Sequence, residues 1–291
     1  MPRTWLVTGA AGGLGQELTR AAVRGGDRVM ATDLDLGALD AVTREYGDRV
    51  RTRVLDVTDS SAAAATVAAT IEELGSLDVV VNNAGHRGVG SIEDMPEEEF
   101  RRHIEINLFG VVNVSRAALP VLRSQRSGHV FQISTIGGRR AQPGIGAYQT
   151  SKWAVGGFSE ILAKELAPVG VHVTLVELGG VRTAWAQTPI PMEDIREEYR
   201  STVGRFAATY NRNPDVQRGD PTKIAEVVVA MTHEPEPPVR LLIGSDSTWL
   251  APRISAVRAA EDEKWRHVSI STDFDGLGDF ADTEVARMVR P

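Results

Sequence analysis

The chain has 291 residues, a net charge of −7 at pH 7, 42% apolar residues and 24% charged residues. Its length is enough for one large α/β domain or two small ones, and its acidic balance argues against a general binder of nucleic acid or of anionic membranes. The absence of cysteine excludes disulfides, thiolate metal sites and cysteine nucleophiles.

The sequence predicts a cytoplasmic protein. It has no run of about 18 uninterrupted apolar residues, so no membrane span is expected. The N-terminal stretch MPRTWLVTGA leads directly into a predicted strand and leaves no room for a signal peptide. We therefore expect a small-molecule substrate and neither a nucleic-acid nor a membrane partner.

The first two-thirds of the chain alternates short apolar runs with longer amphipathic stretches. Most of the runs are rich in Val, Leu and Ile without clean alternation, as expected of strands covered on both faces. The predicted strands are Thr4–Thr8, Arg28–Thr32, Arg51–Leu55, Leu77–Asn82, His129–Ser134 and Val171–Glu177. The predicted helices are Leu14–Arg24, Ser60–Leu74, Glu97–Arg123 and Ala147–Ala167. This βαβ rhythm predicts an α/β fold with a doubly wound, parallel sheet of the Rossmann type.

The pattern changes after Glu177. Residues 183–220 are polar and punctuated by proline, with helical pieces around Glu193–Tyr210. The rhythm then resumes with a predicted helix and a short strand, Thr222–Thr232 and Val239–Ile243. We expect one dinucleotide-binding catalytic domain over residues 1–245, with a lid insert at about 183–220, and a C-terminal extension over residues 246–291.

A glycine-rich turn follows the first predicted strand. Glycines permit positive φ and the close approach of a ligand, and the helix that opens at Leu14 points its free N–H groups and its positive dipole end at this turn. Such a turn can be purely structural, but its place in the first βαβ unit favours a pyrophosphate site. The candidate contacts are Gly9, Ala11, Gly12, Gly13, Leu14 and Gly15.

The second predicted strand ends at Asp33, where a carboxylate can hydrogen-bond the adenosine ribose of a dinucleotide. At ~4 Å and an effective dielectric of ~20, each pair of unit charges repels by about 4 kcal/mol, so this acid disfavours a 2′-phosphate. No basic residue offsets the charge, since alanines stand at positions 10 and 11 and Leu34 follows. We therefore expect NAD, with NADP as the alternative. The competing interpretation is that Asp33 only caps a helix starting near Gly37.

Tyr148 and Lys152 lie four residues apart in a predicted helix, so their side chains project from one face. A lysine charge at ~4 Å, with an effective dielectric of ~20, favours phenolate by roughly 4 kcal/mol, or about three pKa units. That shift would bring the phenol near the operating pH of a general acid–base. A tyrosine and a lysine at this spacing are also common as a plain surface pair. The choice between a surface pair and a catalytic pair therefore depends on the other motifs.

Together these residues resemble the short-chain dehydrogenase/reductase family, over roughly residues 3 to 245. The resemblance depends on five motifs, in this order: Thr8-Gly9…Gly13-Leu14-Gly15, Asp56-Val57, Asn82-Asn83-Ala84-Gly85, Asn107, and Tyr148…Lys152. Each motif is common alone, and their combination at these intervals is specific.

The resemblance implies a role for each motif. Asp56 and Val57 correspond to the pair that holds the adenine ring, and the turn through Asn83, Ala84 and Gly85 to one that borders the cofactor. Asn107 resembles the residue that anchors a water linking Lys152 to solvent, and Lys152 would also bind the nicotinamide ribose. Without the other motifs, a purely structural role for the asparagines would be preferred.

Two departures from the family pattern affect the predicted site. The hydroxyl residue that orients the substrate oxygen most often lies thirteen positions before the tyrosine, which is Thr135, with Ser134 beside it. Neighbours on a strand point to opposite faces, so only one can reach the substrate, and the spacing favours Thr135. Leu178 replaces the usual proline after the sixth strand. The candidate cofactor contacts that follow are Gly179, Val181 and Thr183.

The predicted activity is reversible hydride transfer between nicotinamide and a secondary alcohol or ketone, with Tyr148 as general acid–base. The alternatives are a catalytically silent dinucleotide-binding sensor and, less favoured, an epimerase or dehydratase that uses the same Tyr–Lys pair. The family resemblance also implies a homotetramer or homodimer packed through the two long helices. No metal site is predicted.

The substrate is expected to be apolar, although the residues behind this expectation allow other roles. The apolar lid residues either face the substrate or anchor the lid: Trp185, Ile190, Met192 and Phe206. His86 either lines the pocket or lies in a solvated loop, and Arg139 and Arg140 either meet an anionic substrate or are solvated, with the solvated interpretation favoured for all three.

Overall fold

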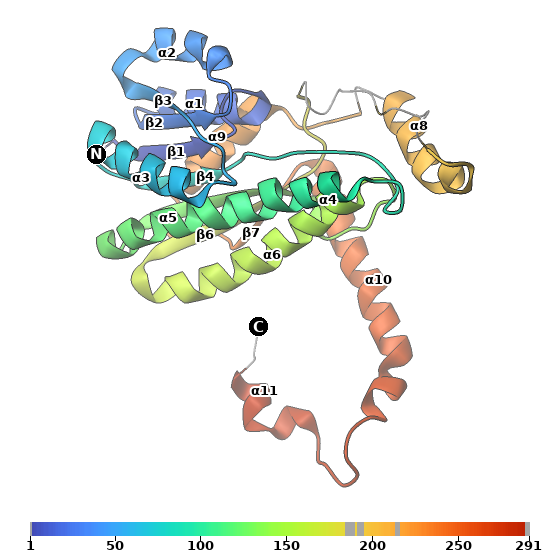
Figure 1. The fold of residues 1–291 in the computed structure, drawn as a ribbon. Coiled ribbons are helices and arrows are strands. Elements are labelled where there is room, and N and C mark those ends of the chain that lie inside the picture. Colours follow the sequence, from blue (N-terminus) through green and yellow to red (C-terminus); the bar gives the residue numbers. More distant parts are fainter. Residues whose placement is uncertain (1, 184–189, 191–194, 213–215, 289–291) are drawn as a thin grey trace. The chain divides into compact units, whose positions relative to one another are not determined.

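The computed structural model describes residues 2–183, 190, 195–212 and 216–288 (Figure 1). The chain forms two compact units, Met1–Ala251 and Pro252–Pro291. The first unit is built on one seven-stranded sheet in the order β3-β2-β1-β4-β5-β6-β7. Its strands are β1 Thr4–Thr8, β2 Arg28–Asp33, β3 Val50–Val54, β4 Val79–Asn82, β5 Gly128–Thr135, β6 Val171–Leu178 and β7 Arg240–Ile243. All neighbouring strands pair in parallel, which confirms the predicted doubly wound fold.

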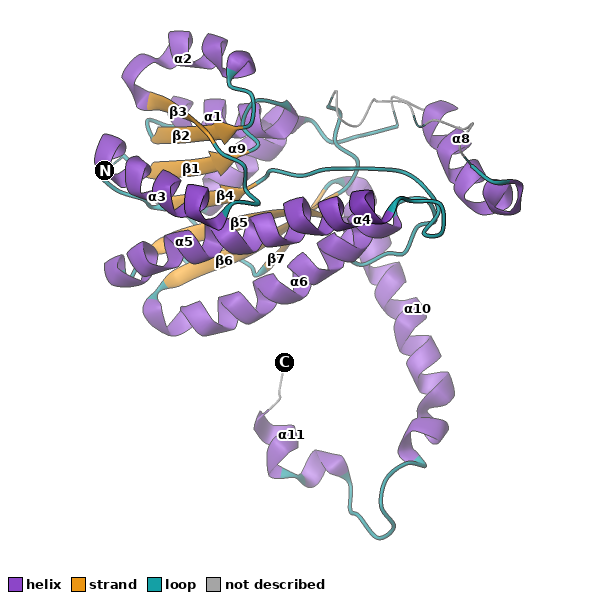
Figure 2. Cartoon of the chain, in the orientation of Figure 1, coloured by secondary structure: helices purple, strands orange, loops and turns teal. Residues whose placement is uncertain are grey.

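Helices cover both faces of the sheet (Figure 2). Side chains alternate along a strand, so in β1 Trp5 and Val7 belong to one buried cluster while Leu6 belongs to the other. This double burial explains why the strands read as continuous apolar runs. The first cluster packs under α1 Gly13–Arg24, α2 Asp40–Tyr46 and α9 Pro221–Met231. The second packs under α3 Ser60–Leu74, α5 Gly110–Gln125 and α6 Gly146–Leu166.

The predicted helix Glu97–Arg123 is interrupted by a π-helical turn. It consists of α4 Glu97–Ile104, the π-helical segment Glu105–Phe109 and α5. By length and composition alone, Glu97–Gln125 is apolar enough to cross a membrane. One such helix is weak support for a membrane span, and its apolar residues are used in the fold: Val114, Ala118 and Leu122 are fully buried in the second cluster.

The segment after β6 carries a small apolar cluster of its own. Short helical pieces, Glu197–Tyr199 and a π-helical turn Arg200–Gly204, lead into α8 Arg205–Arg212. Ile190, Ile195, Val203 and Ala207 are buried in this cluster, with Val89, Phe206 and Tyr210 packed against them. Trp185 and Met192, predicted to lie on the underside of a lid, are outside the described residues.

The chain divides later than the predicted position at residue 245. α10 runs over Ser245–Ile270, and its first turn is bonded to the end of β6. Asp246 accepts a hydrogen bond from the Gly180 N–H at 2.7 Å, and the Ser247 hydroxyl donates to the Glu177 carbonyl at 2.9 Å. These bonds explain why the first unit extends to Ala251. The second unit contains the rest of α10, a 3-10 turn at Phe280–Asp282 and α11 Glu284–Met288, and its side chains are largely exposed.

Candidate active site

The carboxyl ends of the strands open onto a cavity of about 1400 Å³. It lies where the strand order reverses, with β1 between β2 and β4, which is where doubly wound sheets bind ligands. Most of the predicted site residues line this cavity: Gly9, Gly12, Gly13, Leu14, Asp33, Leu34, Asp56, Val57, Asn83, Ala84, Gly85, Ser134, Thr135, Tyr148, Lys152, Gly179, Val181 and Thr183.

Three predicted site residues are not among those that line the cavity: Ala11, Gly15 and Asn107. The Ala11 N–H donates to Asp33 Oδ2 at 2.9 Å. A Cβ on Gly15 would lie 2.1 Å from the Gly9 carbonyl oxygen, so this glycine lets helix α1 pack on the turn. These residues shape the wall, and the cofactor contacts expected of Ala11 and Gly15 stay predictions.

The turn after β1 fits a pyrophosphate. Gly9 has φ +64° and a Cβ there would lie 2.8 Å from the Ala84 Cα, so the turn needs glycine at this position. Helices α3 and α9 are capped by Asp59 and Asp220 side chains. Helix α1 begins after Gly12, which supplies no capping side chain and faces open space where its Cβ would be. The first N–H groups of α1 are thus directed at the cavity with no acidic residue in that turn, an arrangement that binds anions.

Asp33 ends β2 at the cavity wall. Its Oδ2 accepts from Ala11 N at 2.9 Å and its Oδ1 from Leu34 N at 2.8 Å, so the carboxylate is held in place by backbone donors. The competing interpretation of Asp33 as a helix cap is wrong, because Asp35 accepts the hydrogen bond from the Gly37 N–H. The basic residues of the wall come from elsewhere: the loop after β4, helix α4, the loop after β5 and α6.

Two asparagines clamp the loops that frame the cavity. The Asn83 amide donates to the Thr8 and Gly9 carbonyls at 3.0 and 2.9 Å, which ties the phosphate turn to the end of β4. Asn107 is completely buried in the π-helical turn. Its amide oxygen accepts from the His86 N–H and its amide nitrogen donates to the His86 carbonyl, both at 2.9 Å. The Asn107 side chain therefore holds a loop, which is the structural role that the sequence left as the alternative to anchoring a water.

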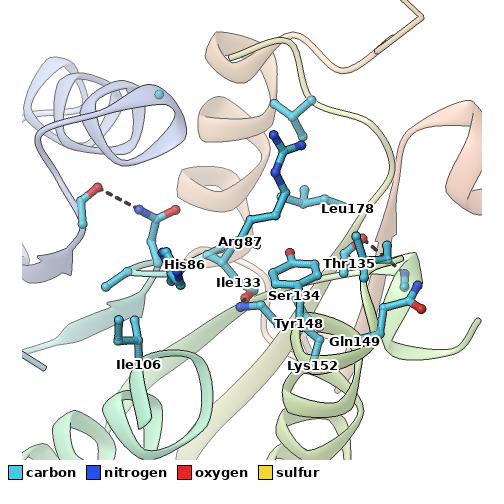
Figure 3. A pocket seen from close by; sticks show the side chains of 18 of the residues that line it. His86, Arg87, Ile106, Ile133, Ser134, Thr135, Tyr148, Gln149, Lys152 and Leu178 are labelled. Carbon is cyan, nitrogen blue, oxygen red and sulfur yellow. Dashed lines mark hydrogen bonds between the residues drawn. The ribbon is translucent and has the colours of Figure 1, made fainter. Parts of the chain in front are cut away.

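Tyr148 and Lys152 both reach the cavity from helix α6 (Figure 3). The Lys152 ammonium donates to the Ile133 carbonyl at 2.8 Å and lies 5.9 Å from the centroid of the Tyr148 ring. Burial lowers the pKa of Lys152 to about 8 and raises the pKa of Tyr148 to about 12.

The predicted lowering of the Tyr148 pKa by Lys152 is therefore wrong for this structure. Desolvation of the phenol outweighs the effect of nearby charge, and the lysine is directed at a carbonyl rather than at the phenol. The positive charge that does lower the pKa of Tyr148 belongs to Arg87, which follows the turn after β4 (Figure 3). Arg87 also donates to the Tyr210 hydroxyl at 2.6 Å.

Ser134 and Thr135 end β5 beside the tyrosine (Figure 3). The Ser134 Oγ is fully buried and has no hydrogen-bond partner among the described residues. The Thr135 side chain is only half-buried, and its Oγ1 accepts from the Gly137 N–H at 3.2 Å, which leaves its own proton to be donated. Accessibility thus agrees with the spacing argument for Thr135.

The turn after β6 is held by a residue that the sequence did not identify as important. Asp246 lines the cavity, accepts from the Gly180 N–H, and fills the space beside Gly179, where a Cβ would lie 1.9 Å from Asp246 Oδ1. This acid fixes the turn in which Leu178 stands at the usual position of proline. The sequence did offer one indication of this role, because Asp246 is an acidic residue shortly after the last predicted strand.

The remaining candidates divide between the wall and the core. His86, Arg140, Ile190 and Phe206 line the cavity, as do Arg87 and Gln149, which were not predicted. Arg139 does not, because it forms an ion pair with the fully buried Glu177. The structural role of Arg139 differs from both predicted alternatives.

Known proteins are similar to this chain in sequence and in fold. A family model described as short chain dehydrogenase matches residues 3–194. The oxidoreductase BOA17 of Botryotinia fuckeliana is 42% identical over 273 residues, 94% of this chain and 100% of that protein. The 3-ketodihydrosphingosine reductase of Bacteroides thetaiotaomicron is 32% identical over 246 residues, 84% of this chain and 88% of that protein. A crystal structure of a short-chain dehydrogenase from Streptomyces avermitilis is similar with a TM-score of 0.83 and 36% identity, covering 94% of this chain and all of that one.

Proposed function

The chain belongs to the short-chain dehydrogenase family of oxidoreductases, and from this premise we propose that it reduces ketones to secondary alcohols with NADH, and reverses the reaction at high pH. The observation that carries the proposal is the placement of Tyr148, Lys152 and Thr135 on one cavity wall with the glycine turn and Asp33. The family implies a nicotinamide dinucleotide, which supplies or accepts the hydride when bound.

The residues of the wall fit such a cofactor. The uncapped start of α1 at Gly12 and Gly13 would hold the pyrophosphate, and Asp33 the adenosine ribose. Asp56, whose Oδ1 is held by the Thr58 N–H and hydroxyl, would contact the adenine. The Asp33 carboxylate and the absence of a basic neighbour in sequence support NAD over NADP, because a 2′-phosphate would meet a negative charge there.

The proton chemistry follows from Tyr148. A phenol with a pKa of about 12 is protonated at neutral pH, which is the form that donates a proton to the oxygen of a ketone as hydride reaches its carbon. Thr135 would orient the same oxygen with its hydroxyl proton. The opposite direction requires phenolate, and forming it at pH 7 costs about 7 kcal/mol, a penalty that shrinks as the pH rises. The Bacteroides relative, named as a reductase of a keto compound, supports this direction.

The substrate end of the cavity supports an apolar ketone. Ile190 and Phe206 line it and belong to the apolar cluster that also contains Val89. We also propose a homodimer or homotetramer packed through α4–α5 and α6, because these helices expose Phe109, Trp153 and Ile161.

A panel of ketones and secondary alcohols, assayed in parallel with NADH/NAD⁺ and NADPH/NADP⁺, tests the proposal. We expect turnover of apolar ketones with NADH at pH 7, and an oxidation rate that increases with pH. Tight binding of NAD(H) without turnover of any compound would instead support the dinucleotide sensor. Cofactor that never dissociates during turnover would support the epimerase or dehydratase.

A further inference from the structure

Three potential metal ligands meet at the edge of the cavity. His86 belongs to the loop after β4, and Glu99 and His103 lie one turn apart on α4. Each residue offers one ligand atom, a ring nitrogen from either histidine and a carboxylate oxygen from Glu99. These three atoms lie within 4.8 Å of one another. We propose that this triad, His86–Glu99–His103, binds one divalent transition-metal ion of the zinc class, independently of the proposed hydride transfer.

The distances are close to those of a tetrahedral site. With metal–ligand bonds of 2.0–2.1 Å, neighbouring ligand atoms in a tetrahedron lie about 3.3 Å apart. His103 Nε2 is 3.5 Å from Glu99 Oε1, and His86 Nε2 is 2.6 Å from the same oxygen. The ion would replace the His86–Glu99 hydrogen bond, and that pair would separate by less than one ångström. The two imidazole nitrogens, which lie within 4.8 Å of each other, would approach to about 3.3 Å.

His103 provides the second observation. Its side chain is completely buried, and neither ring nitrogen has a hydrogen-bond partner among the described residues. A buried polar group without a partner destabilises the fold, because it has lost its hydrogen bonds to water. A metal ion on Nε2 would use the nitrogen that already faces Glu99. Gly88 leaves the room for this ring, because a Cβ there would lie 2.6 Å from Nε2.

The scaffold holds the triad in place before an ion binds. The backbone of His86 is clamped on both sides by Asn107, and the other two ligands share one face of α4, four residues apart. Two imidazoles and one carboxylate are the ligand types that zinc and related ions take at sites with three protein ligands, which leave a fourth position open. Because His86 also lines the cavity, the bound ion would lie at the cavity edge.

The test is metal binding by the intact, full-length protein after chelation and dialysis. Zn²⁺ is titrated by calorimetry and Co²⁺ by visible absorption, in the wild type and in Glu99→Gln and His103→Gln. Glu99→Gln keeps the size of a side chain that is partly exposed, so it guards against a folding defect in the variant of the buried His103. His172→Gln, which removes an exposed histidine outside the triad, is the matched control.

We expect one ion per chain, a tetrahedral Co²⁺ spectrum, and affinity at least tenfold weaker in both triad variants, because loss even of residues behind the ligands weakens metal sites by about 10–100-fold. The control should bind like the wild type. Zn²⁺ should also raise the melting temperature of the wild type and the control but not of Glu99→Gln. Equal binding by wild type and Glu99→Gln, or no stoichiometric binding by the wild type, would overturn the proposal.

Discussion

Substitution of Lys152 should change how the stability of the protein depends on pH. The Lys152 side chain is only 4% exposed, and burial lowers its pKa from 10.5 to about 8. The folded state therefore binds this proton more weakly than the unfolded state does. In wild type the contribution of this group to stability is fully present above pH 10.5 and is lost as the pH falls through 8.

The magnitude follows from these two pKa values. Between pH 7 and pH 10, the wild type should gain about 2.5 kcal/mol of unfolding free energy relative to Lys152→Met, which has no proton to bind. Urea unfolding at pH 7, 8, 9 and 10 measures the difference between the two proteins. Tyr148 is present in both proteins, so its contribution cancels.

Lys164→Met is the matched control, because Lys164 lies on the same helix and is exposed. Its pH dependence should follow that of the wild type. If Lys152→Met and wild type show parallel curves across this range, burial does not lower the pKa of Lys152 and the account of the site electrostatics is refuted.

Four further substitutions test other parts of the structure. Asp33→Asn should raise kcat/KM with NADPH relative to NADH, because about 4 kcal/mol of repulsion toward a 2′-phosphate is removed. Steady-state kinetics with both cofactors measure the ratio, and an unchanged ratio would contradict the role of Asp33. Gly12→Ala should fold normally but bind NADH weakly, because the new Cβ enters open cavity space. Gly15→Ala should destabilise the fold, because its Cβ would lie 2.1 Å from the Gly9 carbonyl oxygen. Thermal melts and NADH fluorescence titrations distinguish these two effects. Burial lowers the pKa of His129 from 6.5 to about 3. Between pH 7 and pH 4 the wild type should therefore lose about 3 kcal/mol of unfolding free energy relative to His129→Gln. Equal loss in the two proteins, measured by denaturant unfolding, would contradict this.

The sequence was sufficient to predict the sheet and many of the residues that line the cavity. Strand positions follow from apolar runs such as the one at Thr4–Thr8. Glycine is required at position 9 by its positive φ and at position 15 by the nearby Gly9 carbonyl. Such features depend on short segments, so they can be recognised without knowing the whole fold.

Properties that depend on distant segments could not be predicted. The pKa of Tyr148 depends on how the cavity buries the phenol and on Arg87, which is distant in sequence. Asn107 bonds to the His86 backbone, and Asp246 bonds to the turn after β6, across long separations in the chain. The division at Ala251 instead of residue 245 has the same origin, because it depends on contacts between the start of α10 and β6.

Turnover by Tyr148→Phe tests the proposed mechanism most directly. The substitution removes the phenolic proton while keeping the ring, so NADH should bind with nearly unchanged affinity by fluorescence titration. Ketone reduction should fall by orders of magnitude, since about 10²–10⁴-fold is typical of a general acid. Tyr46→Phe on α2, away from the cavity, should reduce ketones like the wild type. A kcat for Tyr148→Phe close to that of the wild type, with NADH still bound, would contradict the assignment of Tyr148 as proton donor.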